Sequence, residues 1–186
     1  YVCDCSDIDD IIVFLRDGSM VISKVEEKRF VGKDIIHIDV FAKNDKRTIY
    51  NLIYRDGKSG PTYIKRFNVM SITRDKVYDL TQGNAGSQIL YFSANPNGEA
   101  EVVTILLRQL SNVKKLKFDV DFADLLIKGR IAKGNLVTKY AIKKIELKEK
   151  GISTLRPRKI WYDDTVRRLN VEGRGDLLGE FKRSEE

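Results

Sequence analysis

Alternation of apolar and polar residues with a period of two is the feature that most limits how this chain can fold. It is clearest in four segments rich in β-branched and aromatic side chains, residues 11–15, 20–25, 49–54 and 63–69. Because neighbouring side chains of a strand point to opposite faces, this pattern predicts β-strands. The best helical candidate, residues 140–147, fits a strand equally well, since lysines flank Ile142, Ile145 and Leu147. We therefore expect an all-β fold.

Turn signals recur between these strands. Asp17-Gly18 and, 39 residues later, Asp56-Gly57 each separate two apolar runs and supply the positive φ that a tight hairpin requires. Two further hairpins are expected, with turns at residues 95–98 and at Asp163-Asp164. The first would join residues 89–92 to 102–107, and the second would join residues 160–162 to 166–169.

Glycine-bearing connectors follow one another at roughly 45 to 55 residues, which is the scale of propeller blades. We expect about four blade units in one continuous array, at roughly residues 1–45, 46–93, 94–150 and 151–186. The alternating runs also predict a core, which includes Phe14, Ile22, Ile38, Ile53, Ile64, Leu90, Val103, Phe118 and Leu136.

Positive charge is distributed unevenly along the chain. The net charge is +7, but residues 1–100 sum to zero and residues 111–170 sum to +9. A localised basic region favours a polyanionic partner. No stretch approaches the ~20 apolar residues that a membrane-spanning helix needs, and the start has no basic and apolar leader. We expect a soluble, cytoplasmic fragment of a longer polypeptide.

The sequence offers little for catalysis or metal binding. Its only thiols are Cys3 and Cys5, and its only imidazole is that of His37, too few for a zinc site. Alternation predicts one buried and one exposed cysteine, both reduced, and makes His37 a strand residue. The acidic residues 4–10 lack the glycine and distal glutamate of a calcium loop and predict a solvated turn. We expect no catalytic residue, metal or cofactor in this chain.

One glycine-bearing connector stands out because it interleaves cations and glycines between two strands. Glycines let a backbone approach a phosphate closely, and cations neutralise its charge. The residues expected to bind double-stranded DNA here are Lys128, Gly129, Arg130, Lys133, Gly134 and Asn135. On composition alone, an ordinary solvated turn fits this segment equally well. We expect the three cations to project onto an outer rim and contact phosphates rather than form internal ion pairs.

Other basic residues could extend this patch around the rim. The candidates are Lys33, Arg55, Lys58, Lys65, Arg66, Lys139, Arg156, Arg158, Lys159, Arg167, Arg168 and Arg174. Base-specific readout is expected to be weak, because the sequence has no recognition helix, zinc finger or RNP motif. Trp161 and Tyr162 are expected in the core, and the Gly83-x-x-Gly86 segment is not expected to act as a nucleic-acid clamp, since strands flank it.

Four segments resemble the C-terminal domain family of the bacterial topoisomerase IV and gyrase A subunits. They are Asp-Asp-Ile-Ile-Val-Phe-Leu-Arg-Asp-Gly at 9–18, Arg-Asp-Gly-Lys at 55–58, Leu-Tyr-Phe-Ser-Ala-Asn-Pro-Asn-Gly-Glu-Ala-Glu at 90–101, and Ile-Lys-Gly-Arg followed by Gly-Asn-Leu at 127–136. The gyrase box reads Gln, two basic residues, Gly-Gly, a basic residue and Gly. Residues 128–134 keep only its last basic residue and glycine, which resembles topoisomerase IV and argues against tight chiral wrapping of DNA.

The resemblance implies a β-pinwheel of hairpin-exchanging blades whose basic rim bends DNA. It implies a non-catalytic domain that presents DNA segments to a separate ATP-dependent strand-passage core, in which the remainder of the same topoisomerase polypeptide works with an ATPase subunit. Magnesium and ATP would be used there, and the setting would be DNA topology and chromosome segregation at the bacterial nucleoid. The alternative is a propeller-like protein-interaction module whose basic face keeps it soluble.

Overall fold

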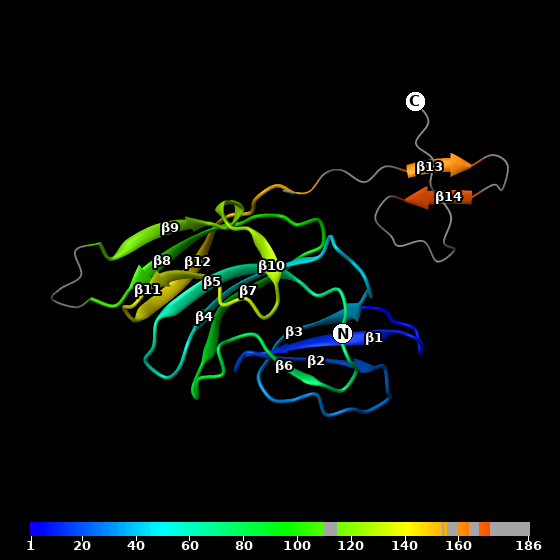
Figure 1. Cartoon of the computed structure of the whole chain (residues 1–186), viewed down its shortest axis with the longest axis horizontal. Helices are drawn as coiled ribbons and strands as arrows, with labels where there is room; N and C mark the ends of the chain where they lie inside the picture. Colours follow the sequence, from blue (N-terminus) through cyan, green and yellow to red (C-terminus); the bar gives the residue numbers. More distant parts are fainter. Residues whose placement is uncertain (110–114, 154, 156–159, 164–167, 172–186) are drawn as a thin grey trace.

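The computed structural model describes residues 1–109, 115–153, 155, 160–163 and 168–171. For the ranges 160–163 and 168–171, only the backbone is described. The described residues form an all-β fold of several sheets whose strands are mostly antiparallel, with one 3-10 turn, Phe122–Asp124 (Figure 1). This arrangement is consistent with the expected β-pinwheel. Within the described residues, no helix is long and apolar enough to cross a membrane.

The first sheet is antiparallel and has the strand order β3-β1-β2-β6. Its strands are β1 (Asp10–Leu15), β2 (Ser19–Lys24), β3 (Ile35–Phe41) and β6 (Val77–Asp79). The β1–β2 hairpin turns at Gly18, whose φ is +95°. The hairpin predicted from Asp17-Gly18 is confirmed.

The second sheet is built on the β4–β5 hairpin, as predicted from Asp56-Gly57. β4 pairs with β7 on its other side, and β5 carries two short strands in series along its outer edge, β10 parallel and β11 antiparallel. The strands are β4 (Ile49–Arg55), β5 (Thr62–Asn68), β7 (Gln88–Asn95), β10 (Ile127–Gly129) and β11 (Asn135–Thr138).

The third sheet has the order β12-β8-β9, with β8 (Val102–Leu107), β9 (Lys117–Asp121) and β12 (Ile142–Glu149). β12 resolves the ambiguity of residues 140–147 in favour of a strand. β13 (Ile160–Asp163) and β14 (Arg168–Val171) pair antiparallel, as expected for the hairpin predicted at Asp163-Asp164. The turn between them, residues 164–167, lies outside the described residues. Among the described strands, these two pair only with each other.

Strands are exchanged between successive sheets. β6 follows β5 in the chain but pairs with β2 of the first sheet, and β10 and β11 follow β9 but pair with β5 of the second. The first two sheets therefore each take an edge from the chain segment that builds the next sheet, as the pinwheel resemblance implied. The residue boundaries of the blade units stay a prediction.

The hairpin predicted at residues 95–98 is wrong. The chain does turn there, since Gly98 N–H donates to the Asn95 carbonyl at 3.0 Å and Gly98 has φ +66°. However, β7 pairs with β4, and β8 pairs with β9 and β12. Turn chemistry sets the local reversal, whereas the partner of each strand is set by the sheet that buries it.

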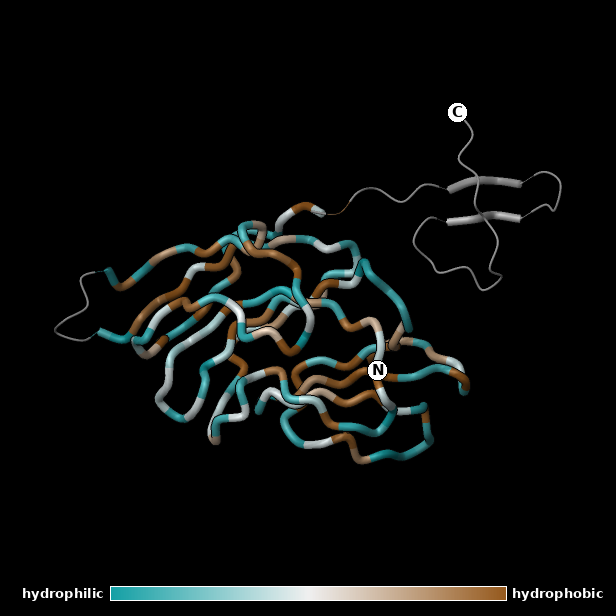
Figure 2. The backbone as a smooth tube through the Cα atoms, in the orientation of Figure 1, coloured by the Kyte–Doolittle hydropathy of each residue, from teal (hydrophilic) through white to brown (hydrophobic). Residues whose placement is uncertain are grey.

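Two apolar clusters cover the two faces of the second sheet, and Figure 2 shows hydrophobic stretches along the strands. Leu52 and Tyr54 of β4 pack with Phe14 of β1 in the first cluster. Ile53, which points to the opposite face, packs with Val103 of β8 in the second. Because both faces of β4 are covered, six of its seven residues are buried.

The predicted core is largely confirmed. Phe14, Ile22, Ile53, Ile64 and Val103 are buried, and Ile38, Leu90 and Phe118 are half-buried. The prediction that Leu136 is buried is wrong, since its side chain is 52% exposed. It lies on edge strand β11, whose register shifts between Leu136 and Thr138, and the neighbouring Val137 packs on the second cluster instead.

The structure also tests the predictions for the two cysteines and for His37. Both Cys3 and Cys5 are exposed free thiols, so the prediction of one buried thiol is wrong; they precede β1 and lie in no strand. His37 lies in β3, as predicted, with its ring 5.9 Å from Phe14 and 5.4 Å from Phe92.

Candidate nucleic-acid interface

Residues 130–134 form a loop over the outer edge of β5, and we call it the basic loop. β10 ends with Gly129 opposite Asn68, and β11 begins with Asn135 opposite Ile64, so the loop spans the stretch of β5 between these partners. Ala132 N–H donates to the Gly129 carbonyl at 3.0 Å. Gly134 has φ +89°, and a Cβ there would lie 2.3 Å from the Ile64 carbonyl oxygen, so the close return to β5 requires glycine.

Two buried polar side chains bind the inner side of the basic loop. Lys65 Nζ donates to the carbonyls of Arg130 at 2.7 Å and Ala132 at 2.9 Å, and Tyr54 Oη donates to the Lys133 carbonyl at 2.8 Å. Lys65 is only 3% exposed. Its burial lowers the pKa of Lys65 to about 8, against the opposing effect of Asp79. The expectation that Lys65 lies on a DNA-contacting surface is wrong.

The inward carbonyls determine where the loop amides point. The chain has no cis peptide bond among its described residues, and in a trans peptide the N–H points opposite to the preceding carbonyl. The N–H groups of Ile131 and Lys133, which follow the Arg130 and Ala132 carbonyls, therefore point away from Lys65. Neither donates to an acceptor in the described part of the chain. The loop thus presents two backbone donors outward.

The three predicted cations of this segment differ in their surroundings. Lys128 is exposed and lines a shallow depression with Gly134 and Asn135. Lys133 Nζ lies 4.6 Å from the Tyr63 ring centroid. Arg130 is half-buried: its guanidinium lies 4.3 Å from the ring centroid of Tyr78, and it donates to the Ser71 carbonyl at 3.1 Å. These aromatic contacts fix the direction of two side chains without neutralising their charge.

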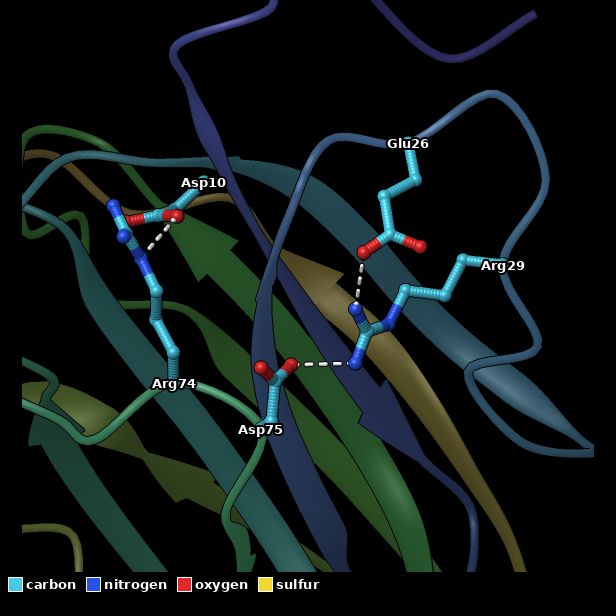
Figure 3. Close-up of polar contacts among 5 residues, drawn as sticks. All are labelled: Asp10, Glu26, Arg29, Arg74 and Asp75. Atoms are coloured by element: carbon cyan, nitrogen blue, oxygen red, sulfur yellow. Dashed lines mark hydrogen bonds and ion pairs between the residues drawn. The ribbon is translucent and has the colours of Figure 1, made fainter.

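None of these three cations forms an ion pair with a carboxylate in the described residues, as we expected. Other cations do. Figure 3 shows Arg29 between Glu26 and Asp75, and Arg74 on Asp10. The pairs of Asp75 and Arg74 tie the chain before β6 to the β2–β3 connector and to β1 of the first sheet. The contrast separates cations already neutralised by the protein from those that remain available to an external anion.

Arg66 is the second basic residue that the structure removes from the predicted surface. It is 2% exposed, and it donates to Asn51 Oδ1 at 3.2 Å and to the Gly98 carbonyl at 2.9 Å. β5 is paired on both edges and covered on both faces, so its adjacent basic residues Lys65 and Arg66 are both buried, on opposite faces of the sheet. Charge along the sequence gives no sign of that burial.

Of the remaining described candidates, three lie on connectors and Arg55 ends strand β4. Lys33 precedes β3, Lys58 lies in the β4–β5 turn, and Lys139 follows β11; all three are exposed. Arg55 is half-buried and donates to the Gly57 carbonyl and to Gln88 Oε1. Among the residues that the structure describes, the largest set of candidates brought together by one segment is Lys128, Gly129, Arg130, Lys133, Gly134 and Asn135.

Sequence reasoning missed Lys76, which is exposed beside β6 with Nζ 5.4 Å from the Tyr78 ring centroid. Because Arg130 stacks on the same ring, Lys76 lies close to the basic loop. Sequence patterns could not show this proximity, because Lys76 and Arg130 are 54 positions apart in the chain.

Several predicted residues cannot be placed. Arg156, Arg158, Lys159, Arg167 and Arg174 lie outside the described residues, and only the backbone of Arg168, Trp161 and Tyr162 is described. Among the described residues there is no group of three or more His, Cys, Asp and Glu side chains that could hold a metal ion. The depression beside Lys128 carries one carboxylate, that of Asp124.

Two comparisons with known proteins identify the family of this chain. A family model described as the topoisomerase C-terminal domain of Bacteroidota matches residues 3–150. The chain is also 28% identical over 149 residues to the A subunit of DNA topoisomerase 4 from Borreliella burgdorferi, an alignment that covers 80% of this chain and 22% of that relative. The chain thus spans about a fifth of the length of the relative it matches. It belongs to the C-terminal domain family of bacterial topoisomerases.

Proposed function

We propose that this chain is the DNA-binding and DNA-bending domain of the A subunit of topoisomerase IV, a type IIA topoisomerase. The domain itself is non-catalytic and presents segments of double-stranded DNA to an ATP-dependent strand-passage core. That core consists of an ATPase subunit together with the remainder of the A subunit, which supply the catalytic residues, magnesium and ATP. The domain acts on nucleoid DNA in the bacterial cytoplasm, in DNA topology and chromosome segregation.

The observation that carries the proposal is the basic loop. Its Arg130 and Lys133 side chains, together with Lys128 of β10, form no ion pair with a carboxylate of the described chain. The outward N–H groups of Ile131 and Lys133 are donors of the kind that bind phosphate oxygens. Cations and backbone amides on one exposed loop suit contacts with a phosphate backbone, which carry no direct information on base sequence.

The direct test is a salt titration of DNA affinity, measured by fluorescence anisotropy with a labelled duplex of about 30 base pairs. A protein that contacts phosphates loses affinity linearly in log–log coordinates as salt increases, with a slope of about 0.9 per phosphate. The triple variant Lys128→Ala, Arg130→Ala, Lys133→Ala should lower this slope by about two to three units.

The matched control removes three cations that are already paired with carboxylates. Arg74 pairs with Asp10, Lys144 with Glu146 and Lys148 with Asp119, all at the surface. Replacing these three cations by alanine removes the same formal charge and should leave the slope within about one unit of wild type. Equal losses in the two triple variants would mean that net charge alone drives binding and would refute a site at the basic loop.

Bending is tested by competition between duplexes of one sequence. A circular or pre-bent duplex should compete better than a linear one, because bending 20–30 base pairs by 40–90° costs about 1–6 kcal/mol. Equal competition would argue against bending. Binding that ignores salt altogether would instead favour the protein-interaction module.

A further inference from the structure

Lys65 is buried, and yet all three donors of its ammonium group are hydrogen-bonded. Its three donors are matched by three carbonyl oxygens, those of Leu80 at 2.6 Å, Arg130 at 2.7 Å and Ala132 at 2.9 Å. The ring centroids of Tyr54 and Phe67 lie 5.7 and 5.2 Å from Nζ. Burying an ammonium group is costly unless its hydrogen bonds are replaced, so these carbonyls have to stay where they are.

The three carbonyls come from the two exchanged segments. Leu80 directly follows β6, which belongs to the first sheet, whereas Arg130 and Ala132 belong to the basic loop at the edge of the second. Arg130 adds a second link between the same two segments through Tyr78 and the Ser71 carbonyl. Lys65 therefore lies where the two exchanged segments meet β5.

The hydrogen bonds of Lys65 determine which backbone groups face outward on the basic loop. Since Lys65 holds the Arg130 and Ala132 carbonyls inward, the following N–H groups of Ile131 and Lys133 point outward. Without the ammonium group, the Arg130–Ile131 and Ala132–Lys133 peptide planes would lose the contact that fixes their rotation. The outward donors would then no longer be preorganised for an anion.

We propose that Lys65 is a positioning residue for DNA binding, which orients the basic loop from inside without touching DNA. The inference rests on the proposed function of the basic loop. It adds that the phosphate-binding geometry depends on a buried cation in the strand beneath.

Arg66 provides the comparison. It is the next residue of β5 and equally buried, but it binds Asn51 and the Gly98 carbonyl on the opposite face of the second sheet. Its described contacts do not include the basic loop. Lys65→Met and Arg66→Met thus both remove one buried cation from the same strand, and only Lys65→Met releases the basic loop.

Two measurements test the proposal. Amide hydrogen exchange of Ala132, whose N–H is bound to the Gly129 carbonyl, should be at least about tenfold faster relative to β4 amides in Lys65→Met and unchanged in Arg66→Met. The salt slope of DNA binding should fall by about one to two units in Lys65→Met alone. If Lys65→Met does not fold, Lys65→Gln, which keeps a buried donor, replaces it and should show a smaller change in the same direction.

Unchanged Ala132 protection in the Lys65 variant would overturn the proposal. A second refuting result concerns DNA binding. If the triple variant of Lys128, Arg130 and Lys133 lowers the salt slope, but Lys65→Met loses Ala132 protection and keeps the wild-type slope, then DNA contacts the basic loop without needing Lys65 to orient it. Wild-type binding that ignores salt would refute the proposed function, and the DNA role of Lys65 with it. Loss of Ala132 protection would in that case show only that Lys65 orders the loop.

Discussion

Gly129, which directly precedes the basic loop, and Gly134, which ends it, differ sharply in the room that they leave for a side chain. Gly134 has φ +89°, and a Cβ at this position would lie 2.3 Å from the Ile64 carbonyl oxygen and 3.0 Å from the carbonyl carbon. At Gly129, nothing lies within 4 Å of an added Cβ and φ is not in the left-handed region. Alanine at Gly134 should therefore be strongly destabilising, and alanine at Gly129 should not.

The magnitude follows from two separate costs. A left-handed conformation costs an alanine about 1–2 kcal/mol relative to glycine. Relieving the contact with Ile64 forces β11 away from β5, and overpacking of this kind costs about 1–3 kcal/mol. Gly134→Ala should thus lower the free energy of unfolding by about 2–5 kcal/mol, which lowers Tm by roughly 10 °C in a chain of this size. Gly129→Ala should be neutral or stabilising by up to about 1 kcal/mol.

Urea denaturation followed by circular dichroism gives both values under the same conditions. Equal m-values for the three proteins would show that the comparison concerns stability alone. A loss below about 1 kcal/mol in Gly134→Ala would refute the close return of the chain to β5, and so would an equal loss in Gly129→Ala.

Three other predictions concern single side chains. Burial lowers the pKa of His37, so as pH falls from 7 to 5 the unfolded chain takes up a proton before the folded chain does, and the free energy of unfolding decreases. His37→Phe removes this proton uptake, so its free energy of unfolding, measured by urea denaturation, should rise relative to that of wild type over this range. Parallel plots of unfolding free energy against pH for the two proteins would contradict the prediction. Arg130→Ala should cost about 0.5–1 kcal/mol by losing its contact with the Tyr78 ring, which thermal melting can measure against a near-neutral Lys128→Ala. Ile53→Ala should cost about 2–5 kcal/mol and Leu136→Ala less than about 1 kcal/mol by the same method, and a similar loss at both positions would contradict the burial that separates them.

Sequence reasoning succeeded where a feature depends on a few adjacent residues. Asp17-Gly18 and Asp56-Gly57 predicted their hairpins because a tight turn with positive φ is a local property. The glycines and cations of residues 128–134 predicted a loop with cations that form no ion pairs in the described chain. The same reasoning failed at residues 95–98, where the turn exists but the flanking strands pair elsewhere.

By itself, then, the sequence determined the strands, most of their turns and the basic segment between two strands, because alternation and turn chemistry act over a few residues. Only the tertiary structure decided which strands exchange between sheets and which cations stay accessible. Lys65 lies 65 residues from Arg130 in sequence, yet it binds the Arg130 carbonyl. Lys65 can be buried because strand exchange brings three carbonyls to its ammonium group. The residues next to Lys65 in sequence give no indication of these contacts.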